Sequence, residues 1–232
     1  FRKGRVTYCI KPFITKFEKR ANCREVVKEG ETLTYRGSCF VVNVLIVYAH
    51  PSPSSFNAAI LKHVQKGLQE TNHSVTVLDL YKEQFNPVLV FNEDKKRRDL
   101  VNEEETARYR TLVEEADMFL FIYPIWWWGM PAILKGFIDR IFVAGFAYKY
   151  EGALPKGLLK GKKAWVINTL DSPLWYVALL YRSADWIMMK RGVLRFCGIR
   201  DIKRSVFQSV KTSKREKREK WLLQIEEKAR TL

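Results

Sequence analysis

The feature that most restricts the fold of this chain is a regular alternation, from Phe40 onward, of short apolar runs with longer segments of helical spacing. Residues 40–49 (FVVNVLIVYA) are nearly all apolar and largely β-branched, which is typical of a strand buried in a parallel sheet. Such alternation favours a doubly wound α/β fold, with a five-stranded parallel sheet covered on both faces. Strands are expected at residues 40–49, 74–80, 118–123, 163–168 and 199–207, and helices at residues 58–70, 102–116, 132–143, 186–196 and the C-terminus.

The first 40 residues do not share this pattern, because they lack a clean helical or strand periodicity. We therefore expect two parts: an N-terminal extension of uncertain structure at residues 1–40, and one α/β domain at residues 41–232. The alternatives for the extension are an added hairpin or helix, a small appended domain, or residues that precede the natural start of the domain.

The basic charge of the chain is concentrated at its two ends. Of a formal net charge of +16, residues 1–41 and residues 203–232 each carry ten Lys or Arg and four Asp or Glu. A nucleic-acid-binding protein usually places its charge on a recognition element, so no nucleic-acid partner is expected. The C-terminal run mixes both signs, which favours a solvated helix face over one that contacts phosphates or a membrane.

The cysteines and the apolar segments indicate a cytoplasmic protein. Cys9, Cys23, Cys39 and Cys197 form no CxxC pair, which suits a reducing compartment; the alternative, a metal site of the first three, has wide spacings. No apolar signal segment follows the basic start of the chain. Residues 118–133 are short for a membrane span and contain two prolines. His63 and His73 are expected at the surface, and no hydrolase or NTPase motif is present.

Unusual loops follow three of the predicted strands, at the edge where parallel sheets bind ligands. The first, AHPSPSSFN, lacks the glycines of a dinucleotide fingerprint and instead offers hydroxyl and amide groups before a helix. These groups suit a phosphate at a helix N-terminus, or one of them simply caps the helix. The candidates are Ser52, Ser54, Ser55 and Asn57.

The second loop contains three consecutive tryptophans, Trp126, Trp127 and Trp128. In an extended loop their side chains alternate, so at least one must meet solvent or a partner. A flat aromatic ligand explains this loop, and a dimer interface or a tightly packed corner explains it too. The third loop adds a polar cluster of Asn168, Thr169, Asp171 and Ser172, with Tyr176 shortly after.

Two of these blocks are specific enough to indicate a family. LIVYAHPSPSSFN resembles the first flavin loop of the NAD(P)H:quinone oxidoreductase family, whose fold is flavodoxin-like. PIWWWGMPAILKGFIDRIF, which starts at Pro124, resembles that family's second block, and GFAYKY is similar to a segment that lines the substrate pocket from the dimer partner. The resemblance covers roughly residues 42–202.

The resemblance implies a role for each candidate residue. His50, Ser55, Phe56 and Asn57, with the adjacent Ser54, are implied to hold the phosphate-bearing tail of the flavin. Pro124, Ile125 and the three tryptophans are implied to lie along the isoalloxazine ring. Thr169 and its neighbours Asn168, Leu170 and Asp171, with Tyr176, are implied near its pyrimidine end. Tyr148 and Tyr150 match tyrosines of the substrate pocket.

The chain also departs from the family pattern. Leu170 and Asp171 replace a glycine pair of the mammalian-type enzymes, and Arg182 stands where they have a catalytic histidine. Tyr176 and Arg182 are the candidate catalytic residues, because both can stabilise charge that develops on a reduced flavin. The shortness of the chain after the fifth strand favours FMN over FAD.

The expected activity is a two-electron reduction of quinones or similar small acceptors by NADH or NADPH, in a ping-pong cycle of a homodimer. The apolar content around residues 126–146 is expected to exceed what one small domain can bury. Two alternatives remain, a flavodoxin-type electron carrier and a flavin-binding regulatory subunit of a membrane transporter. The transporter partner is the only route to membrane association. No metal is expected.

Overall fold

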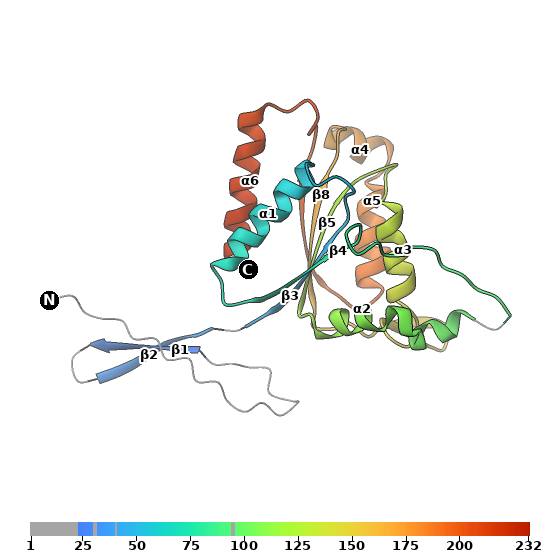
Figure 1. Cartoon of the computed structure of the whole chain (residues 1–232), viewed down its shortest axis with the longest axis horizontal. Coiled ribbons are helices and arrows are strands. Elements are labelled where there is room, and N and C mark those ends of the chain that lie inside the picture. Colours follow the sequence, from blue (N-terminus) through green and yellow to red (C-terminus); the bar gives the residue numbers. More distant parts are fainter. Residues whose placement is uncertain (1–22, 30–31, 40, 94–95) are drawn as a thin grey trace.

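The computed structural model describes the backbone of residues 23–29 and 32–39, and the backbone and side chains of residues 41–93 and 96–232. Its centre is a five-stranded parallel sheet with the order β4-β3-β5-β8-β9 (Figure 1). The predicted flavodoxin-like doubly wound architecture is therefore confirmed. The strands are β3 (Asn43–Tyr48), β4 (Ser74–Asp79), β5 (Met118–Pro124), β8 (Lys163–Thr169) and β9 (Asp201–Phe207).

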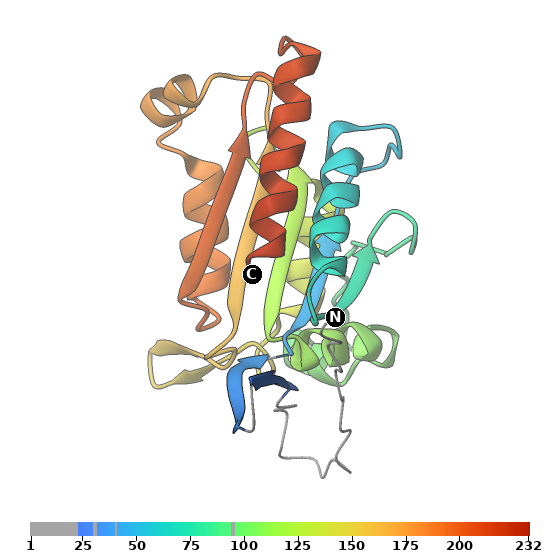
Figure 2. The ribbon, with the colours of Figure 1, turned by 90° about the vertical axis from the view of Figure 1, so that its left-hand side faces the viewer.

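Helices cover both faces of the sheet (Figures 1 and 2). One face is covered by α1 (Phe56–Gln69) and α6 (Arg215–Arg230). The other is covered by α2 (Glu104–Glu115), α3 (Ala132–Ile141) and a helix that begins as α5 (Ala184–Ile187) and continues as the π-helical η2 (Met188–Arg195). A short 3-10 helix, η1 (Arg97–Asn102), precedes α2.

The central strand β5 explains why the sheet needs a cover on each side. All seven of its residues are buried. Leu120 and Ile122 pack in the core beneath α1 and α6, whereas Phe119 and Phe121 pack in the core beneath α2, α3 and η2. Burying each such side chain contributes about 1.5–3 kcal/mol. The continuous apolar run of this strand therefore requires two separate helical layers.

The C-terminal helix is less solvated than its charge suggested, because one side of it packs on α1. A Cβ added at Gly67 of α1 would lie 2.3 Å from the carbonyl oxygen of Glu226, so only glycine allows this approach. Glu226 is buried and lies 2.8 Å from both His63 and Lys66 of α1. His63 and His73 are half-buried, and His73 Nε2 lies 3.1 Å from the carbonyl oxygen of Leu232. Both histidines are therefore partly at the surface, as expected, but each also contacts the C-terminal part of the chain.

Three other features differ from the expectation. Strand β3 begins at Asn43, not at Phe40, which lies outside the described residues. The hairpin of β6 (Tyr148–Glu151) and β7 (Leu154–Gly157) was missed, because its strands are four residues long and mostly exposed. The short helix α4 (Leu174–Leu180) was missed because its exposed positions are themselves apolar, so no amphipathic pattern marks it.

Within the first 40 residues, β1 (Cys23–Glu29) and β2 (Thr32–Cys39) pair as an antiparallel hairpin. The domain boundary at residue 40 stays a prediction. The possible metal site of the N-terminal cysteines lies outside the described side chains. Cys197 is buried, and burial raises the pKa of its thiol to about 12. Among the described residues, no helix is both long and apolar enough to cross a membrane.

Candidate active site

The carboxyl edge of the sheet brings together the loops that follow β3, β5 and β8. The amide of Ile125, in the loop after β5, donates to the carbonyl oxygen of Thr169 at 2.8 Å. The Asn57 side chain, in the first turn of α1, donates from Nδ2 to Thr169 Oγ1 at 2.8 Å. Three segments far apart in the sequence are therefore joined at one edge by direct hydrogen bonds.

The loop after β3 is organised around the start of α1. Ser55 is the N-cap of this helix, and its hydroxyl accepts a hydrogen bond from the Ala58 amide at 3.1 Å. The hydroxyls of Ser52 and Ser54 lie 3.0 Å apart. Helix α1 has no acidic residue in its first turn, so the positive end of its dipole is not neutralised within the helix. Capping is thus one role of Ser55, and the helix end still suits an anion.

Two side chains of this loop have unusual environments. Asn57 is only 3% exposed, and its Oδ1 is buried without a hydrogen-bond partner among the described residues. An orphaned buried oxygen is uncommon and destabilising, so it marks a place where a ligand donor fits. His50 accepts a hydrogen bond at Nδ1 from the Ser52 amide at 3.0 Å, and burial lowers its pKa, which favours the neutral imidazole.

The tryptophan loop is a tight turn, not the extended loop that was expected. The amide of Trp126 donates to the carbonyl of Gly129 at 3.0 Å, and the reverse bond is 2.9 Å. Between them Trp127 and Trp128 have φ values of 49° and 58°. Both central residues of the turn are thus left-handed, an arrangement that favours Asn and Gly and is strained for tryptophan.

The three tryptophans of this turn have different surroundings. Trp127 is 97% exposed, and Trp126 is 41% exposed and lies edge-on to His50 at 5.9 Å. Trp128 stacks on Tyr181, with ring centroids 3.8 Å apart and planes at 21°. The turn therefore holds one ring against the loop after β3, one against α4 and its following turn, and one in solvent. Pro124 and Ile125, which precede the turn, are buried and half-buried.

The two polar residues that end β8 point to different networks. Thr169 faces Asn57, as described above. Asn168 is 1% exposed, and its Oδ1 accepts a hydrogen bond from Arg204 Nε at 3.2 Å. Arg204 also forms an ion pair with the buried Asp185 and lies 4.8 Å from the centre of the Trp186 ring. The structure thus joins Thr169, but not the Asn168 side chain, to the first loop.

The residues after β8 form the rim of this edge. Leu170 is buried, and Asp171 is exposed and accepts the Lys211 amide at 2.9 Å. Tyr176 is half-buried in α4, with its ring 6.0 Å from Trp128 and 5.7 Å from Tyr181. A hydrogen bond with Tyr181 raises the pKa of Tyr176, which therefore keeps its proton at neutral pH. Arg182 is exposed, in a left-handed turn with φ 49°.

Tyr148 and Tyr150 are not brought to this edge. Their hairpin leads into the amino end of β8, and Figure 2 shows it at the opposite end of the sheet from α4. Tyr148 is buried against Phe196 at 4.8 Å between ring centroids, and Tyr150 is 62% exposed. Within one chain these tyrosines cannot line the same pocket as the tryptophan turn.

Sequence reasoning missed two contributors to the site. Tyr181 completes the aromatic cluster with Trp128 and Tyr176, and its only sequence signal is an aromatic residue next to Arg182. Arg204 is the second, a half-buried arginine within a parallel strand. A charged side chain in the middle of such a strand indicates a specific partner, here Asp185, and this signal was available.

Comparison with known proteins agrees with this architecture. A family model described as a flavodoxin-like fold matches residues 42–229. A Haemophilus influenzae protein named as an NAD(P)H oxidoreductase is 33% identical over 73% of this chain and 85% of its own length. The mouse ribosyldihydronicotinamide dehydrogenase [quinone] is 32% identical over 75% of this chain and 85% of its own length.

A crystal structure of a Streptococcus mutans protein superposes with a TM-score of 0.77 and 46% identity, over 82% of this chain and 100% of that one. The region matched by the family model contains all three loops of the carboxyl edge, and at least 85% of the length of each of these relatives is covered. The chain therefore belongs to the NAD(P)H:quinone oxidoreductase family of flavodoxin-like proteins.

Proposed function

We propose that this chain is a flavin-dependent NAD(P)H oxidoreductase that reduces quinones or similar small acceptors by two electrons. The observation that carries the proposal is the junction of three strand-end loops around Asn57, whose buried Oδ1 lacks a partner among the described residues. Ligands of parallel sheets bind at this edge. Family membership supports the same chemistry, since two relatives are named as an NAD(P)H oxidoreductase and a ribosyldihydronicotinamide dehydrogenase [quinone].

The residues present fit a flavin mononucleotide. The N-terminus of α1, with the hydroxyls of Ser54 and Ser55 and the imidazole of His50 nearby, offers one compact site for a phosphate. Phe56 and Asn57 open the helix beside it. One helix end with one hydroxyl cluster matches a monophosphate, so FMN is preferred and FAD is the alternative.

The ring of the cofactor would lie between the tryptophan turn and the end of β8. Ile125 and the tryptophans supply apolar and backbone contacts, and Thr169, Leu170 and Asp171 lie at the other side. We do not propose that the Asn168 side chain contacts the flavin, because it is hydrogen-bonded to Arg204; it supports the end of β8 instead. When bound, the flavin supplies the redox chemistry between NADH or NADPH and the acceptor, which we expect to use the site in turn.

Tyr176 and Arg182 are the residues of this chain proposed to serve the reaction. Tyr176 keeps its proton, and its hydroxyl can donate a hydrogen bond to negative charge on the ring when it turns away from Tyr181. Arg182 is exposed, so it acts only if its side chain turns toward the ring or toward the acceptor. Arg182 directly follows Tyr181 in the sequence and lies with Ser183 in a left-handed turn.

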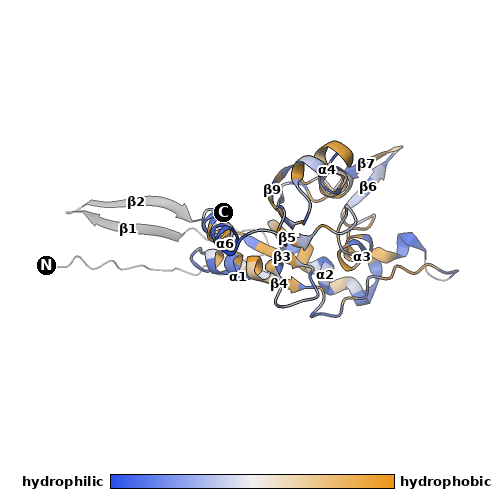
Figure 3. Cartoon of the chain, turned by 90° about the horizontal axis from the view of Figure 1, so that it is seen from above, coloured by the Kyte–Doolittle hydropathy of each residue, from blue (hydrophilic) through white to orange (hydrophobic). Residues whose placement is uncertain are grey.

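A homodimer completes the proposal, although its sequence argument needs correction. Most apolar side chains of residues 126–146 are buried within the chain, so this stretch does not exceed what the domain can bury. One group of exposed large apolar residues lies instead on and around α4 (Figure 3). Its members are Trp127, Leu174, Trp175, Leu179, Leu180 and Ile187. A second copy is proposed to cover this face, and the family resemblance implies that Tyr148 and Tyr150 line the substrate pocket of that second copy.

The decisive experiment is a visible spectrum of the purified protein followed by a turnover assay with NADPH, NADH and a soluble quinone. A bound flavin with multiple turnovers supports the oxidoreductase. A bound flavin that is reduced but passes electrons only to a protein supports the carrier. Binding of neither FMN nor FAD at micromolar concentration would contradict the proposal. Co-purification with a membrane transporter would favour the regulatory subunit, and the cytoplasm is the compartment in which we expect either activity.

A further inference from the structure

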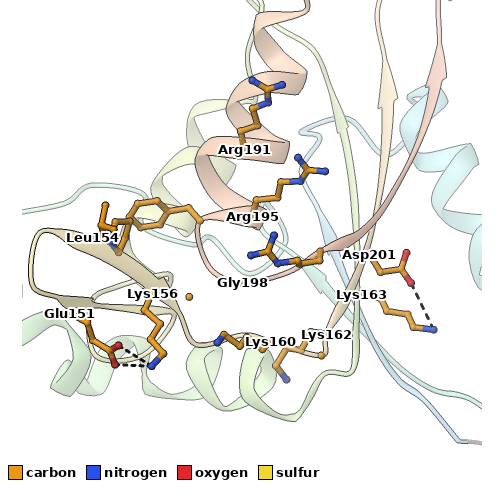
Figure 4. Close-up of a pocket in the computed structure, with 15 residues that line it drawn as sticks. Glu151, Leu154, Lys156, Lys160, Lys162, Lys163, Arg191, Arg195, Gly198 and Asp201 are labelled. Atoms are coloured by element: carbon orange, nitrogen blue, oxygen red, sulfur yellow. Dashed lines mark hydrogen bonds and ion pairs between the residues drawn. The ribbon is translucent and has the colours of Figure 1, made fainter.

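The amino edge of the sheet holds a cavity that the proposed reaction does not use. It has a volume of about 1030 Å³ and lies between the β6–β7 hairpin, the loop that leads into β8, and the C-terminal end of η2 (Figure 4). This is the size of a typical small-molecule site. The cavity is separated from the tryptophan turn by the length of the sheet, because its residues adjoin the first residues of β8 and β9.

The lining of this cavity is strongly basic. Four lysines of residues 156–163 and three arginines of residues 191–200 line it, against only two carboxylates. Glu151 is bound by Lys149 and Lys156, each at 2.9 Å, and Asp201 lies 4.0 Å from Lys163. Each carboxylate is thus already next to a lysine, and neither is left to neutralise the rest of the cavity.

Four cations of the cavity have no carboxylate partner among the described residues. Lys162 is not one of these four, because it donates hydrogen bonds to the carbonyl oxygens of Glu114 and Ala116 and is therefore held at the wall of the cavity. Lys160, Arg191, Arg195 and Arg200 take part in no ion pair with a described residue. Like charges that converge on one cavity repel each other, and a multivalent anion relieves this repulsion.

The walls that carry these cations are fixed to each other. The Leu159 amide donates to the carbonyl oxygen of Cys197 at 2.8 Å. A Cβ added at Gly157 would lie 2.2 Å from the backbone of Cys197 and Gly198, so the hairpin packs directly on the end of the helix. Arg191 and Arg195, four residues apart on η2, project above the lysines of the hairpin and loop (Figure 4). The backbone of the two walls is therefore fixed, while the unpaired cations are carried on exposed side chains that can turn toward a ligand.

We propose that this basic cavity binds a ligand that carries a chain of two or more phosphate groups. Arginine guanidinium groups bind phosphate through paired hydrogen bonds, and lysine adds point charge. The cavity is concave and surrounded by cations from three segments, which suits a compact phosphate chain better than the surface of a membrane or an extended nucleic acid. The phosphate chain belongs either to a free polyphosphate or to a nucleoside polyphosphate.

The test is a calorimetric titration of the full chain with inorganic tripolyphosphate, with ADP, and with a single-stranded oligonucleotide. We expect one binding site for tripolyphosphate or ADP, and the tighter of the two identifies the source of the phosphates. In Arg191→Gln/Arg195→Gln the affinity should fall at least about tenfold, as expected when charge-assisted hydrogen bonds are lost. Thermal unfolding of this variant checks that it folds, and Lys160→Gln/Arg200→Gln is a second variant if it does not.

The control removes two positive charges elsewhere on the surface. Lys62 of α1 and Lys220 of α6 are exposed, and Lys62→Gln/Lys220→Gln should change the affinity by no more than about twofold. Equal losses in both double variants would show attraction by net charge alone and overturn the proposal. It would also be overturned if neither phosphate compound binds, or if only the oligonucleotide does.

Discussion

At the carboxyl edge of the sheet the described side chains are mostly aromatic or neutral, whereas at the amino edge seven lysines and arginines line one cavity. Both edges belong to the same five strands, but they are formed by different segments of the chain. In a parallel sheet every strand runs in the same direction. The residues that follow the strands therefore lie at one edge of the sheet, and the residues that precede the strands lie at the opposite edge. One fold can therefore hold a flat conjugated ligand at one edge and an anion at the other.

The largest expected effect is a loss of FMN affinity when a negative charge is added at the carboxyl edge. In Ser55→Asp the new side chain still caps α1, because Asp and Ser are similar N-caps, so the melting temperature should hold. The added carboxylate, however, would face the proposed phosphate, and FMN affinity should fall by at least about 100-fold, or about 2.7 kcal/mol. Flavin fluorescence titration measures the affinity.

The matched control for this variant is Lys160→Gln, which makes the same change in net charge at the amino edge. Its FMN affinity should equal that of the unchanged protein. If Ser55→Asp binds FMN normally, then capping is the only role of Ser55. The proposal that the N-terminus of α1 binds the phosphate of the flavin would then be wrong.

A smaller effect is expected on rate alone. In Tyr176→Phe, a donor to charge that develops on reduction is lost, so stopped-flow reduction by NADPH should slow by about tenfold, less than for the strongest such donors. The affinity for oxidised FMN should not change. Tyr109→Phe, which removes a hydroxyl from α2 far from the tryptophan turn, should keep the normal rate. A normal rate in Tyr176→Phe would make this tyrosine a packing residue.

The strained turn predicts a gain in stability. Trp127 is left-handed and 97% exposed, so Trp127→Asn removes strain and little packing. The free energy of unfolding should rise by up to about 1 kcal/mol, since Asn tolerates this conformation. In the control Trp175→Asn, the replaced residue is an exposed helical tryptophan of α4, and no gain is expected. Chemical denaturation measures both, and a loss of stability in Trp127→Asn would refute the strain.

The smallest effect concerns the charge of His50. Burial lowers its pKa below the usual 6.5, so its NMR titration midpoint should lie below that value. The unfolded chain then binds a proton more readily, and stability falls as the pH drops through 6.5 toward the lower folded pKa. His50→Gln should weaken this decline. A midpoint above 6.5 would contradict the lowering of the His50 pKa by burial.

Much of this molecule could be predicted because its strands are buried on both faces. The apolar runs of β3 and β5 cannot be solvated, and their order along the chain leads directly to the parallel sheet. The loops of the site were also visible, since polar and aromatic residues directly after buried strands have few structural reasons to be there. The side-chain partners were not visible: Thr169 meets Asn57, and Asn168 meets Arg204, because neighbours on a strand point to opposite faces.

The remaining features depend on distances that sequence does not give. The turn at Trp127 was unexpected because tryptophan is not a residue that favours positive φ, and only the surrounding contacts hold it there. The basic cavity draws on residues 156–163 and 191–200, which no local pattern connects. Hairpin β6–β7 decides where Tyr148 lies, and so whether it serves its own chain or a second copy.

The thiol of Cys197 can report local opening between the β6–β7 hairpin and the end of η2. With a pKa near 12 and only 3% of its surface exposed, this thiol should react slowly with an alkylating reagent while the hairpin stays packed on the helix through the Leu159–Cys197 hydrogen bond. The rate at which mass spectrometry finds this cysteine labelled, read separately from Cys9, Cys23 and Cys39, therefore gives the free energy of opening of this part of the fold. A ligand that bridges the two walls would slow that labelling in proportion to its occupancy.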